Sequence, residues 1–151
     1  MGQMDYIQSF FKSAGANACY ALSLIDIARD VTKERKIIAF SVNEEEALIY
    51  GIEKGYIDFN KNNYDDTHNF YVKRPDLFME AMTGSKWSVR IEGPDYKCQE
   101  EEYEILFWAL NDENAKKGIG HFTRPGKNSL QTSNTVKNGK VYSKRIFKKL
   151  K

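Results

Sequence analysis

The sequence predicts an α+β domain in which helices come first and an antiparallel sheet follows. Apolar residues between positions 6 and 31 recur at helical spacing, whereas from Trp87 onward they alternate with polar residues or form short runs typical of strands. Helices that precede a group of strands favour separate layers over a parallel sheet. We therefore expect N-terminal helices, one of them central and buried, packed on a C-terminal antiparallel sheet.

Length and composition limit the classes of protein to which the chain can belong. Its 151 residues suffice for a sizeable core, and we expect a single domain over residues 1–151. The 23 basic and 21 acidic side chains nearly balance, so we expect no nucleic-acid partner. No apolar run reaches the roughly 18 residues of a membrane span, and the N-terminus lacks a signal-peptide pattern. We therefore expect a cytoplasmic protein that does not bind membranes.

The segment 13–31 organises the predicted fold. It begins with small residues and continues as a nearly all-apolar helix, for which Asn17 is a candidate cap and Cys19 is then the second residue. A short helix over residues 5–11 precedes it and is expected to pack against it. The apolar character around the whole circumference predicts that the segment 13–31 lies at the centre of the domain.

Two further helices have clear end signals. Ser41 or Asn43 caps the first of them, which has three glutamates in its first turn and stops at Gly55. Residues 75–82 form the second, which starts with a proline and is closed by Gly84.

The second half of the chain predicts a meander of antiparallel strands. Residues 111–118 are expected to be a polar loop, residues 124–127 a tight turn, and Asn138-Gly139 the turn into the last strand. The basic side chains from position 144 to the C-terminus are interpreted as a solvated end. The expected strands are 87–92, 103–110, 120–123 and 140–147.

Cys19 is the first candidate for chemistry. Cysteine attacks as the thiolate, which a helix N-terminus and a neighbouring imidazole both favour. Taken alone, Cys19 also fits a small buried core residue, because cysteine is among the most buried residue types. The other cysteine, Cys98, lies in an acidic loop. We therefore expect no disulfide, and we expect the protein to reside in a reducing compartment.

His121 is the candidate base, since His68 lies in a polar loop where a solvated imidazole is ordinary. If residues 124–127 form the turn, Asn128 is a diagonal cross-strand neighbour of His121. Its amide oxygen could then accept the imidazole N–H and fix the orientation of the ring. The two cysteines and two histidines lack the short spacing of a zinc site, so neither a metal nor a cofactor is expected.

The chain order of a cysteine at a helix start, a histidine on a strand and a carboxamide on the next strand resembles papain-like cysteine peptidases. The pattern is similar to the compact fold of bacteriocin-leader peptidases and NlpC-type cell-wall hydrolases. It more closely resembles an uncharacterised, mostly phage- and plasmid-borne bacterial family. That resemblance rests on the segments YIQSFFKSAGANACYALSLIDIA, KWSVRIEG, EYEILFWAL, GHF and NSLQTSNTVKNGKVYSKRIF.

The resemblance implies a papain-like fold and a peptidase or amidase that cleaves an amide bond of a peptide or peptidoglycan-like substrate. It makes Cys19 the nucleophile, His121 the base and Asn128 the residue that orients the base. Papain-like enzymes place an oxyanion-hole glutamine shortly before the cysteine, and Gln8, eleven residues upstream, is the candidate here. The alternative is a catalytically degenerate papain-like module from a phage or mobile element that binds a host protein.

Overall fold

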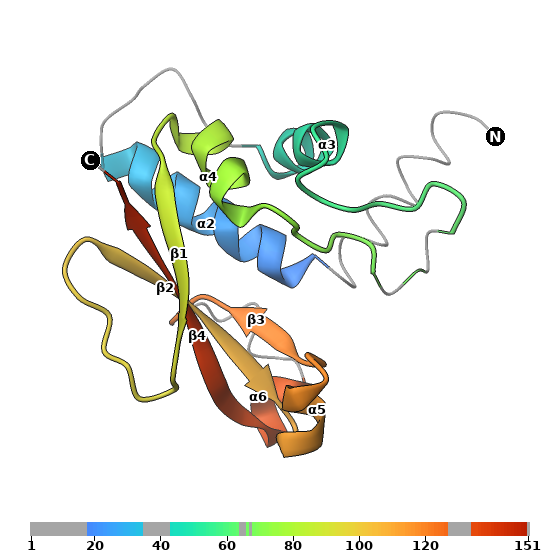
Figure 1. The fold of residues 1–151 in the computed structure, drawn as a ribbon, viewed down its shortest axis with the longest axis vertical. Coiled ribbons are helices and arrows are strands. Elements are labelled where there is room, and N and C mark those ends of the chain that lie inside the picture. The colour runs from blue at the N-terminus through green and yellow to red at the C-terminus, as the bar shows by residue number, and fades with distance from the viewer. Residues whose placement is uncertain (1–17, 35–42, 64–65, 67, 127–133, 151) are drawn as a thin grey trace.

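The computed structural model describes residues 18–34, 43–63, 66, 68–126 and 134–150. Helices pack on a four-stranded antiparallel sheet, which confirms the α+β prediction (Figure 1). The expected helix at 5–11 and its contact with the next helix lie outside the described residues. In chain order the elements are α2 (Cys19–Glu34), α3 (Glu44–Glu53), α4 (Pro75–Thr83), β1 (Trp87–Glu92), β2 (Glu102–Ala109), α5 (Asp112–Lys116), β3 (His121–Thr123), α6 (Asn134–Asn138) and β4 (Lys140–Lys149).

Helix α2 is the buried central helix that its apolar sequence predicts. Leu24, Ile25 and Ile27 are fully withdrawn from solvent. The carbonyl of Ala18 accepts the first helical hydrogen bond, from the backbone N–H of Leu22 at 2.8 Å. Cys19 is therefore the first helical residue and not the second, and the candidate cap Asn17 lies outside the described residues.

The end signals of the other two long helices are confirmed. Of the two expected caps for α3, Asn43 fills the role, since its Oδ1 accepts from the backbone N–H of Glu46 at 3.1 Å. Helix α4 begins at Pro75 and ends at Thr83, and its C-cap residue is Gly84, whose φ of 74° suits a residue without a Cβ.

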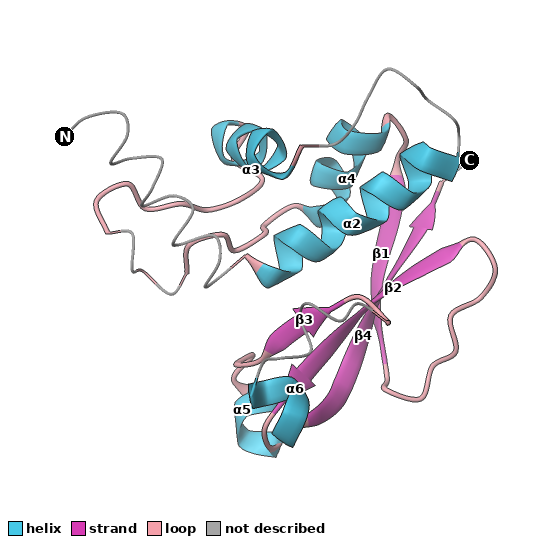
Figure 2. Cartoon of the chain, turned by 180° about the vertical axis from the view of Figure 1, so that it is seen from behind, coloured by secondary structure: helices cyan, strands magenta, loops and turns pink. Residues whose placement is uncertain are grey.

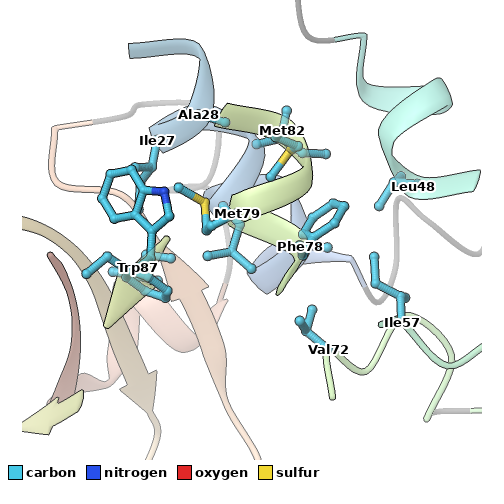
Figure 3. Close-up of a cluster of buried hydrophobic side chains, with 14 of the residues drawn as sticks. Ile27, Ala28, Leu48, Ile57, Val72, Phe78, Met79, Met82 and Trp87 are labelled. Atoms are coloured by element: carbon cyan, nitrogen blue, oxygen red, sulfur yellow. The ribbon is translucent and has the colours of Figure 1, made fainter. Parts of the chain in front are cut away.

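The core lies where α2, α4 and β1 meet. Figure 3 shows Phe78 and Met79 of α4 between Trp87 of β1 on one side and Ile57 on the other. The indole N–H of Trp87 donates to Thr83 Oγ1 at 2.8 Å, so the buried ring keeps a hydrogen-bond partner. This contact ties the sheet to the helical layer.

The sheet has the order β1-β4-β2-β3, so the expected meander is wrong. The last strand, β4, lies between β1 and β2 and pairs with both in antiparallel register. Asn138-Gly139 is consequently not a hairpin turn: it ends α6 and leads into β4. A Cβ on Gly139 would collide with the carbonyls of Ala109 and Thr135, so a close backbone approach requires glycine there.

Two other expectations need correction. Residues 112–116 form the short helix α5, capped by Asn111 Oδ1, within the expected loop. The basic end of the chain is mostly strand β4, where Lys144 and Arg145 are partly buried and not fully solvated. Figure 2 shows α5 and α6 together at the end of the sheet away from α4.

Candidate functional site

The first turn of α2 lies against β3, the edge strand that carries His121 (Figure 1). The ring of Phe122 packs on Tyr20 of α2, with ring centroids 4.6 Å apart, and on Phe107 of β2 at 4.9 Å. Phe122 therefore faces the helical layer. The structure thus brings the strand of the candidate base to the helix start of the candidate nucleophile.

The imidazole of His121 projects from the other face of the sheet. Side chains alternate along a strand, so His121 and Thr123 point away from the face that carries Phe122. The hydrogen bond from Trp108 Nε1 to Thr123 Oγ1, 2.9 Å long, marks this second face. Among the described residues no hydrogen bond joins the thiol of Cys19 to the imidazole of His121.

Cys19 is partly exposed and surrounded by backbone donors. Burial raises the pKa of its thiol above the usual value, and hydrogen bonds from the backbone N–H groups of Phe122, Tyr20 and Cys19 itself lower it in part. Two of these donors belong to the unpaired first turn of α2 and one to the edge of β3. The sulfur thus lies near backbone N–H groups of two elements, the first turn of α2 and the edge strand β3.

The imidazole of His121 has a buried nitrogen without a partner. Its Nε2 is withdrawn from solvent and makes no hydrogen bond within the described part of the chain. Burial lowers the pKa of His121 below its usual value. The pKa shifts of Cys19 and His121 therefore both favour the neutral form of each group.

Gly120 fixes the position at which β3 begins. A Cβ on this residue would collide with the carbonyl of Trp108 and would lie 2.6 Å from Cε1 of Phe107. Only glycine lets the backbone approach β2 this closely. Gly120 therefore allows β3 to lie close to β2, and the two residues that follow it, His121 and Phe122, point to opposite faces of the sheet.

Asn128 and Gln8 lie outside the described residues, so their roles stay predictions. Cys98 is partly exposed in the loop between β1 and β2, and His68 is exposed in the polar loop, where its backbone N–H donates to Asp66 Oδ1 at 2.9 Å.

Arg124 holds β3 against α2, although its sequence position predicts only a tight turn. Its guanidinium forms ion pairs with Asp26 at 3.1 Å and Asp30 at 3.2 Å, and also donates to the carbonyl of Glu104 at 2.8 Å. The side chain is only 12% exposed. The signal that could have revealed it is the i, i+4 spacing of the two aspartates on an otherwise apolar helix.

A large hollow and the candidate thiol lie at opposite ends of α2. The hollow has a volume of about 910 Å³ and is lined by Val31, Trp87, residues 99–103 and residues 148–150. Val31 is twelve residues beyond Cys19, which corresponds to about 18 Å along a helix. Within the described ranges, no group of three or more His, Cys, Asp or Glu side chains is arranged to hold a metal ion.

Comparison with known proteins gives the family of the chain. Among the described residues, no helix combines the length and the apolar character that crossing a membrane requires. No curated protein and no solved structure is similar to the chain. A protein family matches residues 6–149, nearly the whole sequence. The chain belongs to this family, which is described as "Protein of unknown function, DUF261".

Proposed function

We propose that the protein is a small cysteine hydrolase of papain-like fold, a peptidase or amidase that uses Cys19 as its nucleophile. The observation that carries the proposal is the place of Cys19 in the first turn of α2 against β3, where the backbone N–H groups of Cys19, Tyr20 and Phe122 lower the pKa of its thiol in part. Such donors stabilise a thiolate, and they also stabilise the oxyanion that forms when a carbonyl is attacked. The backbone of β3 could thus supply a donor besides the one assigned to Gln8.

The proposed reaction is acyl transfer in two steps. The sulfur of Cys19 attacks the amide carbonyl and its proton passes through the imidazole of His121 to the leaving amine, so that the C–N bond breaks and a thioester forms. Water then attacks the thioester, which releases the carboxylic acid and restores the thiol. Asn128 and Gln8 keep the roles of orienting residue and oxyanion donor, and no metal or cofactor takes part.

The second candidate function is a catalytically degenerate module that binds a protein, and one observation favours it. The imidazole of His121 projects from the sheet face opposite to α2, and burial keeps both the thiol and the imidazole neutral. In the hydrolase proposal, the imidazole comes within hydrogen-bond reach of the sulfur in the free protein in solution. In the second proposal no such approach takes place.

The rate of thiol alkylation separates the two proposals. We expect iodoacetamide at pH 7.5 to label Cys19 about tenfold faster than Cys98, the effect of one pKa unit on the thiolate fraction. Cys98 is a matched internal control because burial and nearby glutamates raise its pKa as well. Site-resolved mass spectrometry over time gives both rates in the same sample.

The variants complete the test. His121→Ala should remove the advantage of Cys19, whereas His68→Ala, an exposed histidine, should leave it unchanged. Equal labelling of the two cysteines in the folded wild-type protein, or an advantage that survives His121→Ala, would contradict the hydrolase and favour the binding module.

A further inference from the structure

Arg145 lies in the middle of β4, on the sheet face that carries α2. Its register partner on β2 is Ile105, a core residue, and its guanidinium lies over the rings of Phe107 at 5.3 Å and Phe122 at 5.1 Å. Burial lowers the pKa of Arg145, although the group stays charged at any physiological pH. A charged group in such apolar surroundings needs hydrogen-bond partners to offset its desolvation.

The guanidinium of Arg145 has few partners. Within the described chain it donates to Ser143 Oγ and forms no ion pair, although a guanidinium carries five N–H donors. The other four arginines of the described ranges each have at least one carboxylate partner: Arg29 with Glu44, Arg74 with Asp76, Arg90 with Glu92 and Glu102, and Arg124 with Asp26 and Asp30. Arg145 thus differs from these four arginines because no carboxylate of the described residues pairs with it.

The unused donors of Arg145 remain accessible. None of its nitrogens is both fully buried and unpaired. On β1 its register partner is Ile91, which shares its face of the sheet and is 64% exposed. The β1 side of Arg145 is therefore open, and a ligand could reach the guanidinium from there.

Arg145 also lies close to the candidate nucleophile. Phe122, whose ring packs under the guanidinium, provides one of the N–H groups directed at the sulfur of Cys19. Tyr20, the residue after Cys19, packs on the same ring and interacts electrostatically with Arg145. Burial raises the pKa of Tyr20, so its phenol is neutral and does not satisfy the charge of Arg145.

We propose that Arg145 binds a carboxylate group of a ligand beside Cys19. If the chain is the hydrolase proposed above, on which this second step rests, its substrate is a peptide-like molecule that carries a carboxylate near the bond that is cut. A guanidinium matches carboxylate and phosphate equally well in shape. A single cation over two phenylalanine rings favours the singly charged carboxylate.

The test follows ligand binding by NMR and does not require a reactive thiol. The ¹⁵N-labelled protein is titrated with N-acetylglycine and, in parallel, with its neutral amide N-acetylglycinamide. We expect N-acetylglycine to shift the Arg145 Nε–H signal and the backbone signals of Tyr20 and Phe122. The amide should bind about tenfold more weakly, because a charge-assisted hydrogen bond is lost. Equal binding of both probes, or no shift at these residues, would overturn the proposal.

The variants locate the effect. Arg145→Gln should abolish the preference for the acid, and Arg145→Lys should retain only part of it, because an ammonium lacks the planar fork. Arg74→Gln, which removes an arginine already paired with Asp76, is the matched control and should behave like the wild type. If Arg145→Gln does not fold, the comparison of acid and amide on the wild-type protein still decides. Tighter binding of inorganic phosphate than of N-acetylglycine would overturn the choice of carboxylate.

The outcomes for the two proposals are distinguishable. Shifts with N-acetylglycine together with a slow Cys19 in the alkylation test would leave a carboxylate-binding protein without hydrolase chemistry. A fast, His121-dependent Cys19 without any preference for the acid would leave a hydrolase whose substrate is not recognised by Arg145.

Discussion

At the residue scale, the candidate thiol and imidazole share one physical constraint. Burial raises the pKa of the thiol and lowers that of the imidazole, so it disfavours a thiolate–imidazolium pair. The backbone N–H groups around Cys19 oppose this effect only in part. In the hydrolase proposal, an approach of the imidazole to the sulfur supplies the rest.

The lowered pKa of His121 makes the stability of the fold depend on pH. The unfolded chain binds a proton near pH 6.5, whereas the folded imidazole binds it only at lower pH, so unfolding takes up a proton in that window. The stabilisation is present above the unfolded pKa and is lost as the pH falls through the folded pKa. We expect the free energy of unfolding to fall between pH 7.5 and pH 5 more in the wild type than in His121→Gln.

Urea unfolding of the wild type and of the His121→Gln variant at the two pH values measures this difference. His68→Gln serves as the control, because His68 is exposed and its variant should follow the wild type. A variant at position 121 that loses as much stability as the wild type would contradict the assignment of the effect to this histidine.

The sequence predicts the positions of Cys19 and His121 but not the sheet face of the imidazole. The small residues before Cys19 and the Gly-His-Phe segment are sufficient to predict a helix start and a strand. The three-residue strand β3 contains Phe, Thr and His, none of which alone marks the buried face. Arg145 was missed for a related reason: a run of basic residues looks solvated unless its place at the centre of the sheet is known.

At the element scale, Arg124 is the main polar link between β3 and α2. Arg124→Ala would leave the carboxylates of Asp26 and Asp30 without this cation and the carbonyl of Glu104 without this donor. We expect the free energy of unfolding to fall by about 2 kcal/mol, because the guanidinium of Arg124 is largely withdrawn from water while the two carboxylates are partly exposed. Denaturant unfolding at neutral pH measures the loss.

Lys117→Ala is the control for this prediction. Lys117 forms an exposed i, i+4 ion pair with Glu113, and its removal should cost about 0.5 kcal/mol or less. If the two variants lose similar amounts of unfolding free energy, the ion pairs between α2 and Arg124 stabilise the fold no more than an exposed ion pair does.

The elements themselves were predictable wherever local chemistry decides them. Asn43, Pro75 and Gly84 are end signals that act within a few residues, and the structure uses all three. Helix α5 carries similar signals in Asn111 and Gly118, but its five residues contain too few apolar positions to show a helical period. Its assignment as a loop followed from composition and not from capping.

At the scale of the whole molecule, the order of the strands could not be read from the sequence. Turn signals and alternation describe each strand and its immediate neighbours, whereas β4 pairs with β1 across some fifty residues. The burial of the neighbouring residues Ile146 and Phe147, both fully withdrawn from solvent, fits the central place of β4, because successive side chains of a strand point to opposite faces.

The central place of β4 predicts that the sheet depends on the C-terminal residues. A chain that ends at Asn138 lacks the strand that joins β1 to β2, so we expect it not to unfold cooperatively and to have poorly dispersed amide NMR signals. A chain without Lys151 alone is the control and should unfold like the full sequence. Cooperative unfolding of the shorter chain would show that β1 and β2 reach a stable arrangement without β4.

The position of β4 also has a consequence for synthesis. Cys19 emerges from the ribosome early, but the sheet that holds β3 beside it closes only when the last strand has been made. A chain terminated before β4 therefore carries the thiol without Arg145 and without the strand that completes the sheet beside it. Assembly of the candidate site thus waits for the synthesis of β4.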